Sequence, residues 1–478
     1  MQLGTNEKLW NSILKVPSTR WMLRAALKEC PKCGRTRLET ASDDYVGRGD
    51  AKCLSCSLCS FAIRFWIEFL RKNFKVNEKR ALKIVGDPYS RRAMKSIVHG
   101  FLDFGLHRPL SISAPFLVVW NFTYKCNLKC KHCYLDAGGD FGHELSTSEA
   151  LKVVDQIADF GVTSLAFSGG EPLMRRDFFE VAKHAADSGL YVSVATNGTL
   201  LNRENVKVLK KIGVNYVEVS VDGVYPETHD DFRGINGAFN KTLDGITACV
   251  EEGMCTCFAV TATKNNLKEV PPILEMARKV GARRFTLFNF IPTGRGKDFF
   301  ELDPSPTERE EILKFLNQKL HEDTGLAIMT TTPQLARVAI QCPTQEAVVM
   351  PLAHMSATKM NRKAQALADF IGGCGAGRFY CAVSPEGLVQ PCVFLPIVVG
   401  DLTKERFSQI WNRSPVFDIL RDRANLKGRC GKCSFKYVCG GCRARAYAYF
   451  SDYLAPDPGC IRELEEPTVQ KDMRSENG

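Results

Sequence analysis

The chain has 478 residues, 45% hydrophobic and 24% charged, the composition of a globular protein with room for two or three domains. Its first residues are polar, and no apolar run is long enough to cross a bilayer. We therefore expect neither a secretion signal nor a transmembrane segment, and we expect a cytoplasmic protein. The net charge of +11 is concentrated in residues 1–115, which hold 21 Lys and Arg against 10 Asp and Glu. That surplus predicts a basic module that meets an anionic substrate or partner.

The sequence contains 20 cysteines. Thiols stay reduced in the cytoplasm, so this number indicates metal or cofactor ligation rather than disulfides. The cysteines fall into blocks that predict three domains, at residues 1–114, 115–335 and 336–478.

The first block contains CPKC and CLSC, separated by nineteen residues. This spacing is typical of a structural zinc site, and a mononuclear iron fits it equally well. The predicted ligands are Cys30, Cys33, Cys53 and Cys56. A fifth cysteine, Cys59, leaves a further iron–sulfur cluster as the alternative.

Aromatic and basic residues interleave in FAIRFWIEFLRKNFK, which follows this block at residues 61–75. The spacing predicts a helix that packs on the neighbouring domain and presents a solvated basic face. An interfacial membrane helix is the alternative.

From about residue 116 to residue 330, β-branched or aromatic runs alternate with helical patterns that end on glycine. The expected strands are 116–123, 163–170, 190–198, 216–223, 255–263 and 284–294. Strands that alternate with helices indicate a parallel sheet with right-handed crossovers. Six such units favour an α/β fold in the form of a full or partial (β/α) barrel.

Polar motifs follow the first four expected strands. They are CNLKCKHC at 126–133, SGGEP at 168–172, TNG at 196–198 and SVDG at 220–223. Any one of them alone is consistent with an ordinary turn. In (β/α) barrels the loops after the strands gather at one face, so we expect the four motifs to form one site.

The first motif offers three thiolates, Cys126, Cys130 and Cys133, whereas a zinc ion or a fully ligated iron–sulfur cube takes four protein ligands. A 4Fe–4S cube held by three cysteines leaves one iron open to a chelator that carries an amine and a carboxylate, such as S-adenosylmethionine. In SGGEP, two glycines permit close backbone approach, and Glu171 offers an acceptor for the cationic amine. A three-cysteine structural metal site is the alternative.

The cysteine spacing, with His132 before the last cysteine and GGEP further on, resembles the radical S-adenosylmethionine (radical SAM) superfamily. The resemblance covers roughly residues 115–330. It implies a 4Fe–4S cluster and reductive cleavage of S-adenosylmethionine to a 5′-deoxyadenosyl radical. It also implies cofactor contacts from Gly169, Gly170 and Glu171 to the methionine part and from Asn197, Ser220 and Asp222 near the ribose.

Eight cysteines lie between Cys374 and Cys460, enough for two more 4Fe–4S cubes. The Gly387-x4-Cys392 turn and the CGGC run resemble the SPASM domain, the auxiliary-cluster extension of radical enzymes that mature peptides and cofactors. That resemblance implies one cluster on Cys374, Cys381, Cys392 and Cys442 and a second on Cys430, Cys433, Cys439 and Cys460. A pair of zinc knuckles is the alternative.

Within these families, Val393 stands where the sulfatase-maturing members carry an acidic residue, which argues against that activity. CGGCRARAYAY, DYLAPDPGC and PTGRG resemble enzymes that modify haem or iron-porphyrin side chains and the pyrroloquinoline quinone and mycofactocin peptide maturases. We expect an enzyme that oxidatively modifies a peptide or tetrapyrrole-type cofactor precursor, with a flavodoxin or ferredoxin as electron donor.

Two other functions stay open from the sequence. One is a radical enzyme that acts on a lipid or another anionic small molecule. The other, from a different class, is a non-catalytic iron–sulfur electron-transfer scaffold, which would not need GGEP. Nucleic acid is not an expected partner, because no reading module is visible.

Overall fold

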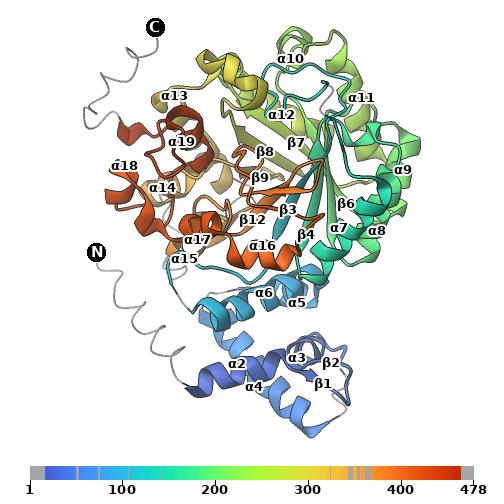
Figure 1. Ribbon diagram of the computed structural model, residues 1–478, viewed down its shortest axis with the longest axis vertical. Coiled ribbons are helices and arrows are strands. Elements are labelled where there is room, and N and C mark those ends of the chain that lie inside the picture. Colours follow the sequence, from blue (N-terminus) through green and yellow to red (C-terminus); the bar gives the residue numbers. More distant parts are fainter. Residues whose placement is uncertain are drawn as a thin grey trace.

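The computed structural model describes residues 17–49, 53–73, 76–105, 107–139, 142–322, 324–342, 348–352, 356–360 and 368–463. A central sheet is covered on one side by helices, a small helical module lies at one end, and the cysteine-rich C-terminal region lies beside the sheet (Figure 1). None of the helices in these residues is both long and apolar enough to cross a bilayer.

The sheet has ten strands in the order β14-β13-β12-β3-β4-β5-β6-β7-β8-β9. The six predicted strands are confirmed as β3 (Leu117–Thr123), β4 (Ser164–Gly169), β5 (Tyr191–Thr196), β6 (Val214–Ser220), β7 (Thr256–Ala262) and β8 (Arg284–Asn289). They pair in parallel with their neighbours in chain order. Among the described residues, β14 and β9 form the two edges, so the structure is a partial barrel.

Four further strands extend this sheet beyond the prediction. They are β9 (Ala327–Thr330), β12 (Tyr380–Val383), β13 (Leu388–Gln390) and β14 (Gly400–Asp401). The first two join in parallel, β9 beside β8 and β12 beside β3, whereas β13 and β14 are antiparallel. The predicted boundary at residue 336 therefore does not interrupt the sheet.

Side chains alternate along each barrel strand. On β3, Val118, Trp120 and Phe122 point into the buried layer under the helices, whereas Leu117 and Val119 line the inside of the barrel. The covering helices are α7 (Thr147–Asp159), α8 (Phe178–Asp187), α9 (Arg203–Lys211), α10 (Pro226–Arg233), α11 (Ala238–Glu251), α12 (Val270–Val280) and α13 (Pro306–His321). Capping boxes fix the start of several of these, as in α7, where Ser146 and Glu149 bond to each other's backbone N–H groups.

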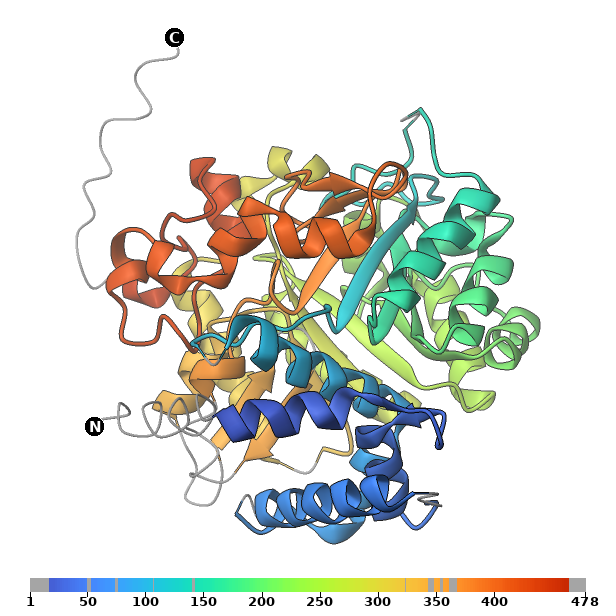
Figure 2. The same ribbon diagram turned by 60° about the horizontal axis from the view of Figure 1, so that its bottom comes forward.

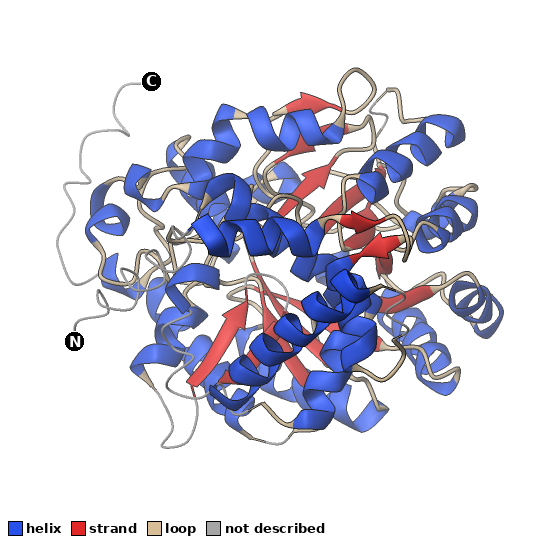
Figure 3. Ribbon diagram, turned by 90° about the horizontal axis from the view of Figure 1, so that it is seen from below, coloured by secondary structure: helices blue, strands red, loops and turns tan. Residues whose placement is uncertain are grey.

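The N-terminal module consists of α2 (Pro17–Leu27), β1 (Glu29–Cys30), β2 (Arg35–Thr36), α3 (Arg37–Tyr45), α4 (Leu54–Asn73), α5 (Glu78–Gly86) and α6 (Pro88–Phe104). Its helices lie across the end of the sheet when the molecule is seen from below (Figure 3). On α6, the Tyr89 ring packs edge-on against Tyr191, the first residue of β5, at 5.0 Å. Arg92, also on α6, donates to the carbonyl oxygen of Gly189 at 3.1 Å. These contacts fasten the module to the barrel.

The expected helix in residues 61–75 is present as α4, but its predicted packing is wrong. α4 lies against α3, where the Tyr45 hydroxyl donates to Glu68 at 2.6 Å. Its aromatic side chains face solvent, with Phe61 76% and Phe65 62% exposed. α4 lies at the end of the molecule farthest from the C-terminal helices (Figure 2).

The C-terminal region adds α14 (Leu335–Gln341), the hairpin of β10 (Val348–Leu352) and β11 (Ser356–Met360), α15 (Ala368–Ile371), α16 (Phe407–Arg413), α17 (Pro415–Arg421), α18 (Gly428–Lys432) and α19 (Arg443–Phe450). Trp411 and Phe417 from α16 and α17 belong to the main hydrophobic core. The region therefore folds onto the barrel as a continuation of it.

Candidate functional site

The loop after β3, residues 126–133, is called the cluster loop here. The structure brings its three cysteines into one apolar group with Leu128 and Ala238. N–H donors approach each sulfur, from the Leu128 backbone to Cys126 at 3.5 Å and from the Ala137 backbone to Cys133 at 3.3 Å. Burial raises the pKa of the Cys126 thiol to about 12. A metal that binds here must therefore displace protons.

The cluster loop opens onto a cavity of about 330 Å³ inside the barrel. Its lining includes all three loop cysteines together with Gly169, Gly170, Asn197 and Ser220. The predicted convergence of the four polar motifs at one face is confirmed. This arrangement leaves room beside the thiolates for a ligand that is not part of the chain.

Gly169 and Gly170 are required by close contact between β4 and the start of the cluster loop. Gly169 has a φ of +113°, and a Cβ there would lie 2.7 Å from the Thr123 carbonyl oxygen. At Gly170 a Cβ would lie 2.2 Å from the Lys125 carbonyl oxygen. The Gly170 N–H donates to Thr123 at 2.8 Å. The glycines thus bring the two loops together and leave their backbone at the cavity wall.

Glu171 lies between the loops after β4 and β5, and its predicted contact with a ligand amine stays a prediction. Its carboxylate is fully buried, is absent from the cavity lining, and accepts from the Thr196 hydroxyl and the Asn197 backbone N–H, each at 2.8 Å. Burial raises its pKa to about 7. Glu171 therefore ties the loop after β4 to the loop after β5.

Asn197 and Ser220 line the cavity as predicted, but Asp222 lies behind it. Asp222 is fully buried, accepts from the Thr261 backbone N–H at 2.8 Å, and forms an ion pair with Arg233. Arg233, at the end of α10, lines the cavity, and its Nη1 lies 3.6 Å from the Cys130 sulfur. Asp222 thus positions a cation beside the cluster loop. Sequence reasoning missed Arg233, which belongs to none of the four motifs.

A polar group deeper in the barrel was also missed. The Arg284 guanidinium lies 4.6 Å from the centre of the Tyr216 ring, and the Tyr216 hydroxyl donates to Glu218 at 2.9 Å. Burial raises the pKa of Glu218 to about 7. All three side chains line the cavity from alternate positions of β6 and the first position of β8. The available signal was a polar residue at every second position of β6 from Tyr216 to Ser220.

The first predicted auxiliary ligand set needs a correction. Cys392 and Cys442 share a hydrophobic cluster with Tyr380, and Cys374 packs against it. The Tyr380 hydroxyl donates to the Cys392 sulfur. Cys381 follows Tyr380 on β12, points to the opposite face, and lies in the main core instead. The structure therefore brings three of these four cysteines together, next to the cavity that Tyr380 and Phe394 line.

The second predicted set is brought together by the segments around α18 and α19. Burial and the neighbouring Cys460 raise the pKa of the Cys439 thiol well above its usual value. N–H groups surround these sulfurs, among them Asp457 to Cys430 at 3.4 Å and Arg462 to Cys433 at 3.6 Å. Donors aimed at buried sulfurs are what a cluster with thiolate ligands needs.

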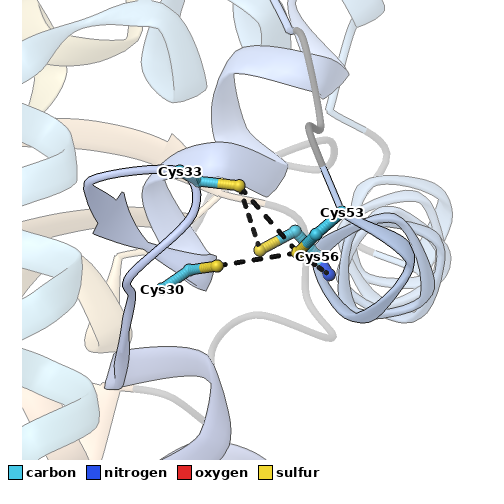
Figure 4. A group of neighbouring side chains, drawn as sticks. All are labelled: Cys30, Cys33, Cys53 and Cys56. Carbon is cyan, nitrogen blue, oxygen red and sulfur yellow. Dashed lines mark hydrogen bonds between the residues drawn. The ribbon is translucent and has the colours of Figure 1, made fainter.

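The N-terminal cysteines form a compact group that we call the N-terminal knuckle: Cys30, Cys33, Cys53 and Cys56 (Figure 4). Their four sulfurs all lie within 4.8 Å of one another. Cys30 to Cys53 and Cys33 to Cys56 are each 3.6 Å, and Cys33 to Cys53 is 4.0 Å. Sulfurs bound at 2.3 Å around one tetrahedral ion are about 3.8 Å apart. The spacing suits a single ion rather than a cube, and Cys59 does not join the group.

Comparison with known proteins agrees with this geometry. Residues 120–281 match the radical SAM superfamily, and residues 374–434 match the SPASM iron–sulfur cluster-binding domain. An AdoMet-dependent heme synthase of Methanosarcina barkeri is 39% identical over 73% of this chain and 97% of its own length. A pre-heme d1 synthase of Dinoroseobacter shibae is 31% identical over 75% of this chain and 89% of its own.

A solved structure has the same fold. SuiB of Streptococcus suis, bound to S-adenosylmethionine, superposes with a TM-score of 0.61 at 15% identity, covering 85% of this chain and 90% of its own. The extent of the match to the heme synthase, together with three thiolates at the mouth of a partial barrel, decides the family. This chain belongs to the radical SAM superfamily and is an enzyme with a SPASM iron–sulfur domain.

Proposed function

We propose that this enzyme oxidatively modifies an iron tetrapyrrole that carries carboxylate side chains. The observation that carries the proposal is the near full-length match, at 39% identity, to an AdoMet-dependent heme synthase. An Fe-coproporphyrin III synthase of Methanosarcina barkeri is 34% identical over 88% of its own length. The peptide maturases are more distant, with a mycofactocin maturase and a PqqA peptide cyclase each at 28%.

The cavity supports this substrate class. Beside the cluster loop its wall is formed by Phe290, Ile291 and Phe394, large apolar side chains that suit a flat macrocycle. Arg284 adds a cation to the lining. Among the described residues, its guanidinium forms no ion pair. A substrate with an apolar ring and acidic side chains matches such a surface.

Different residues of this chain would hold the cluster and contact S-adenosylmethionine. When bound, S-adenosylmethionine and a 4Fe–4S cluster supply a 5′-deoxyadenosyl radical. Cys126, Cys130 and Cys133 would hold the cluster, and Arg233 places a positive charge beside Cys130. Gly169 and Gly170, Asn197 and Ser220 would contact the nucleoside and its methionine part through the cavity wall.

Two auxiliary 4Fe–4S clusters complete the proposed cofactors. Cys374, Cys392 and Cys442 would hold one, and Cys430, Cys433, Cys439 and Cys460 the other. The N-terminal knuckle would hold one zinc or one iron. The electrons that start the reaction would come from a flavodoxin or a ferredoxin.

The test uses anaerobically reconstituted protein with dithionite, S-adenosylmethionine and iron coproporphyrin III. We expect 5′-deoxyadenosine to form together with a new porphyrin product detected by mass spectrometry. A variant with Cys126, Cys130 and Cys133 replaced by Ala is the control and should form neither. Release of 5′-deoxyadenosine while the porphyrin stays unchanged would show that the substrate class is wrong, and modification of an acidic precursor peptide would then favour the maturase function.

A further inference from the structure

α4 carries a continuous apolar surface on the outside of the N-terminal module, called the apolar stripe here. It consists of Leu54, Leu58, Phe61, Phe65 and Phe69, which are 78, 64, 76, 62 and 45% exposed. Their spacing of four, three, four and four residues places them along one helix face. Trp66 and Leu70 flank the stripe and are 38 and 39% exposed. So many large apolar side chains on one helix mark an interaction surface.

The opposite side of α4 is already occupied. Cys56 and Ser60 are buried in the module, and Cys56 belongs to the N-terminal knuckle. Glu68 accepts from Tyr45 at 2.6 Å and pairs with Arg71 at 2.8 Å. The helix is thus held to the module by the N-terminal knuckle and by a hydrogen-bonded ion pair. The apolar stripe plays no part in this packing.

The exposed charges of α4 and of α5, the next helix along the chain, are mainly positive. Glu68 is the acidic residue of α4, and Arg71 neutralises it, whereas Arg64 and Lys72 are exposed. On α5, which follows directly, Lys79, Arg80 and Lys83 are exposed against Glu78. These residues belong to the part of the chain that holds 21 basic and 10 acidic residues. A partner for this face must therefore be both apolar and anionic.

We propose that α4 binds the surface of an anionic lipid bilayer. The apolar stripe would enter the boundary between head groups and acyl chains, and the flanking Lys and Arg would meet the phosphates. A helix of 20 residues is about 30 Å long, so it can lie flat in this boundary along its whole length. Aromatic side chains flanked by cations are typical of such interfacial helices.

Two other occupants fit the observations less well. A second copy of the chain would bring together two modules with the same positive surplus, which repel each other. An electron-donating protein must dock near the iron–sulfur sites. However, α4 lies at the bottom of the molecule, well away from α18 and α19 on its upper left side, in both views (Figures 1 and 2). A bilayer requires neither arrangement.

The test is co-sedimentation of the anaerobically purified full-length protein with vesicles. One set contains equal parts of phosphatidylglycerol and phosphatidylcholine, and the other contains phosphatidylcholine alone. We expect binding to the anionic vesicles at low salt, weaker binding at high salt, and little binding to the neutral ones. The variant Phe61→Gln/Phe65→Gln/Phe69→Gln should lower the partition coefficient by about tenfold or more.

A matched variant with Leu at the same three positions should bind within about threefold of the unaltered protein, because it keeps an apolar face. All variants should release 5′-deoxyadenosine at the same rate, which shows that they fold. The proposal is wrong if the unaltered protein does not bind anionic vesicles. It is also wrong if the Gln variant binds them as tightly as the unaltered protein.

Two results would assign the stripe to another occupant and equally overturn the proposal. Light scattering could show a dimer that the Gln variant converts to a monomer, which would identify a self-association interface. Alternatively, binding could appear only after residues 1–16 are removed, which would identify that segment as the cover of the stripe.

Discussion

The cluster loop and the N-terminal knuckle are both cysteine groups, yet they are built in opposite ways. The knuckle has four sulfurs within 4.8 Å of one another, a number and spacing that saturate a single tetrahedral ion. The cluster loop has three cysteines, all of which line a cavity of about 330 Å³. The knuckle is closed on itself, whereas the loop is incomplete without something from outside the chain.

The number of cysteines distinguishes a structural from a catalytic metal site. A structural site closes with four ligands, and a catalytic site keeps a position open. The residues around the cluster loop also indicate an open site, because backbone glycines, Asn197, Ser220 and Arg233 line the cavity beside it. The knuckle instead joins β1, a strand of two residues, to the first turn of α4.

Removing the thiolates of the cluster loop should have the largest effect. Replacing Cys126, Cys130 and Cys133 by Ala should reduce 5′-deoxyadenosine release to background, because no cluster can form there. Metal analysis of the same variant should show the N-terminal ion unchanged. Turnover at the rate of the unaltered enzyme would contradict the assignment of the open site.

Removing the ligands of the knuckle should have the second largest effect, confined to its own module. Structural zinc contributes about 10–16 kcal/mol in zinc-finger peptides, so Cys53→Ser/Cys56→Ser should unfold the region around α3 and α4. Hydrogen exchange would detect this as lost amide protection in residues 37–73 while the barrel stays protected. Uncoupled cleavage of S-adenosylmethionine should continue, and its loss would mean that the two sites depend on each other.

The buried ion pair behind the cluster loop offers a smaller and sharper test. In Arg233→Gln the carboxylate of Asp222 stays buried without its cation, which should lower the free energy of unfolding by about 3–5 kcal/mol. The double variant Arg233→Gln/Asp222→Asn removes both charges and should recover most of the loss. Thermal unfolding of the two variants makes this measurement, and equal stability of the single and double variants would contradict the pairing.

The smallest expected effect is that of replacing Cys381, which we expect not to bind the auxiliary cluster. Cys381→Ala removes one sulfur from the core and should cost about 1–2 kcal/mol, with the iron content unchanged. Cys392→Ala should instead lose iron on the scale of one cluster, about four atoms per chain. Iron and sulfide analysis distinguishes the two, and equal iron loss in both variants would restore Cys381 to the ligand set.

The sequence predicted the six barrel strands and the meeting of their loops, because strand periodicity and fixed loop motifs are local signals. It also predicted, from spacing alone, that the four cysteines of the knuckle lie together. β9 and β12 were missed because each has four residues, too few to show a pattern. Whether β12 joins the sheet depends on its pairing with β3, far away in the chain.

Side-chain direction was the part that spacing did not reveal. Glu171 and Asp222 stand in the expected motifs, but each turns away from the cavity to satisfy a buried partner. Cys381 points to the wrong face because Tyr380, its neighbour on the strand, takes the face toward Cys392. Arg233 comes from α10, so only the fold brings it to the cluster loop.

The most direct test of the contrast between the closed and the open site is anomalous diffraction from anaerobic crystals at the iron and zinc edges. We expect one single-atom peak between Cys30, Cys33, Cys53 and Cys56, of zinc or iron. At the cluster loop we expect a four-iron cluster in which Cys126, Cys130 and Cys133 bind three irons and the fourth has no protein sulfur. A four-iron cluster in the N-terminal knuckle, or a single zinc held by the cluster loop, would contradict the account.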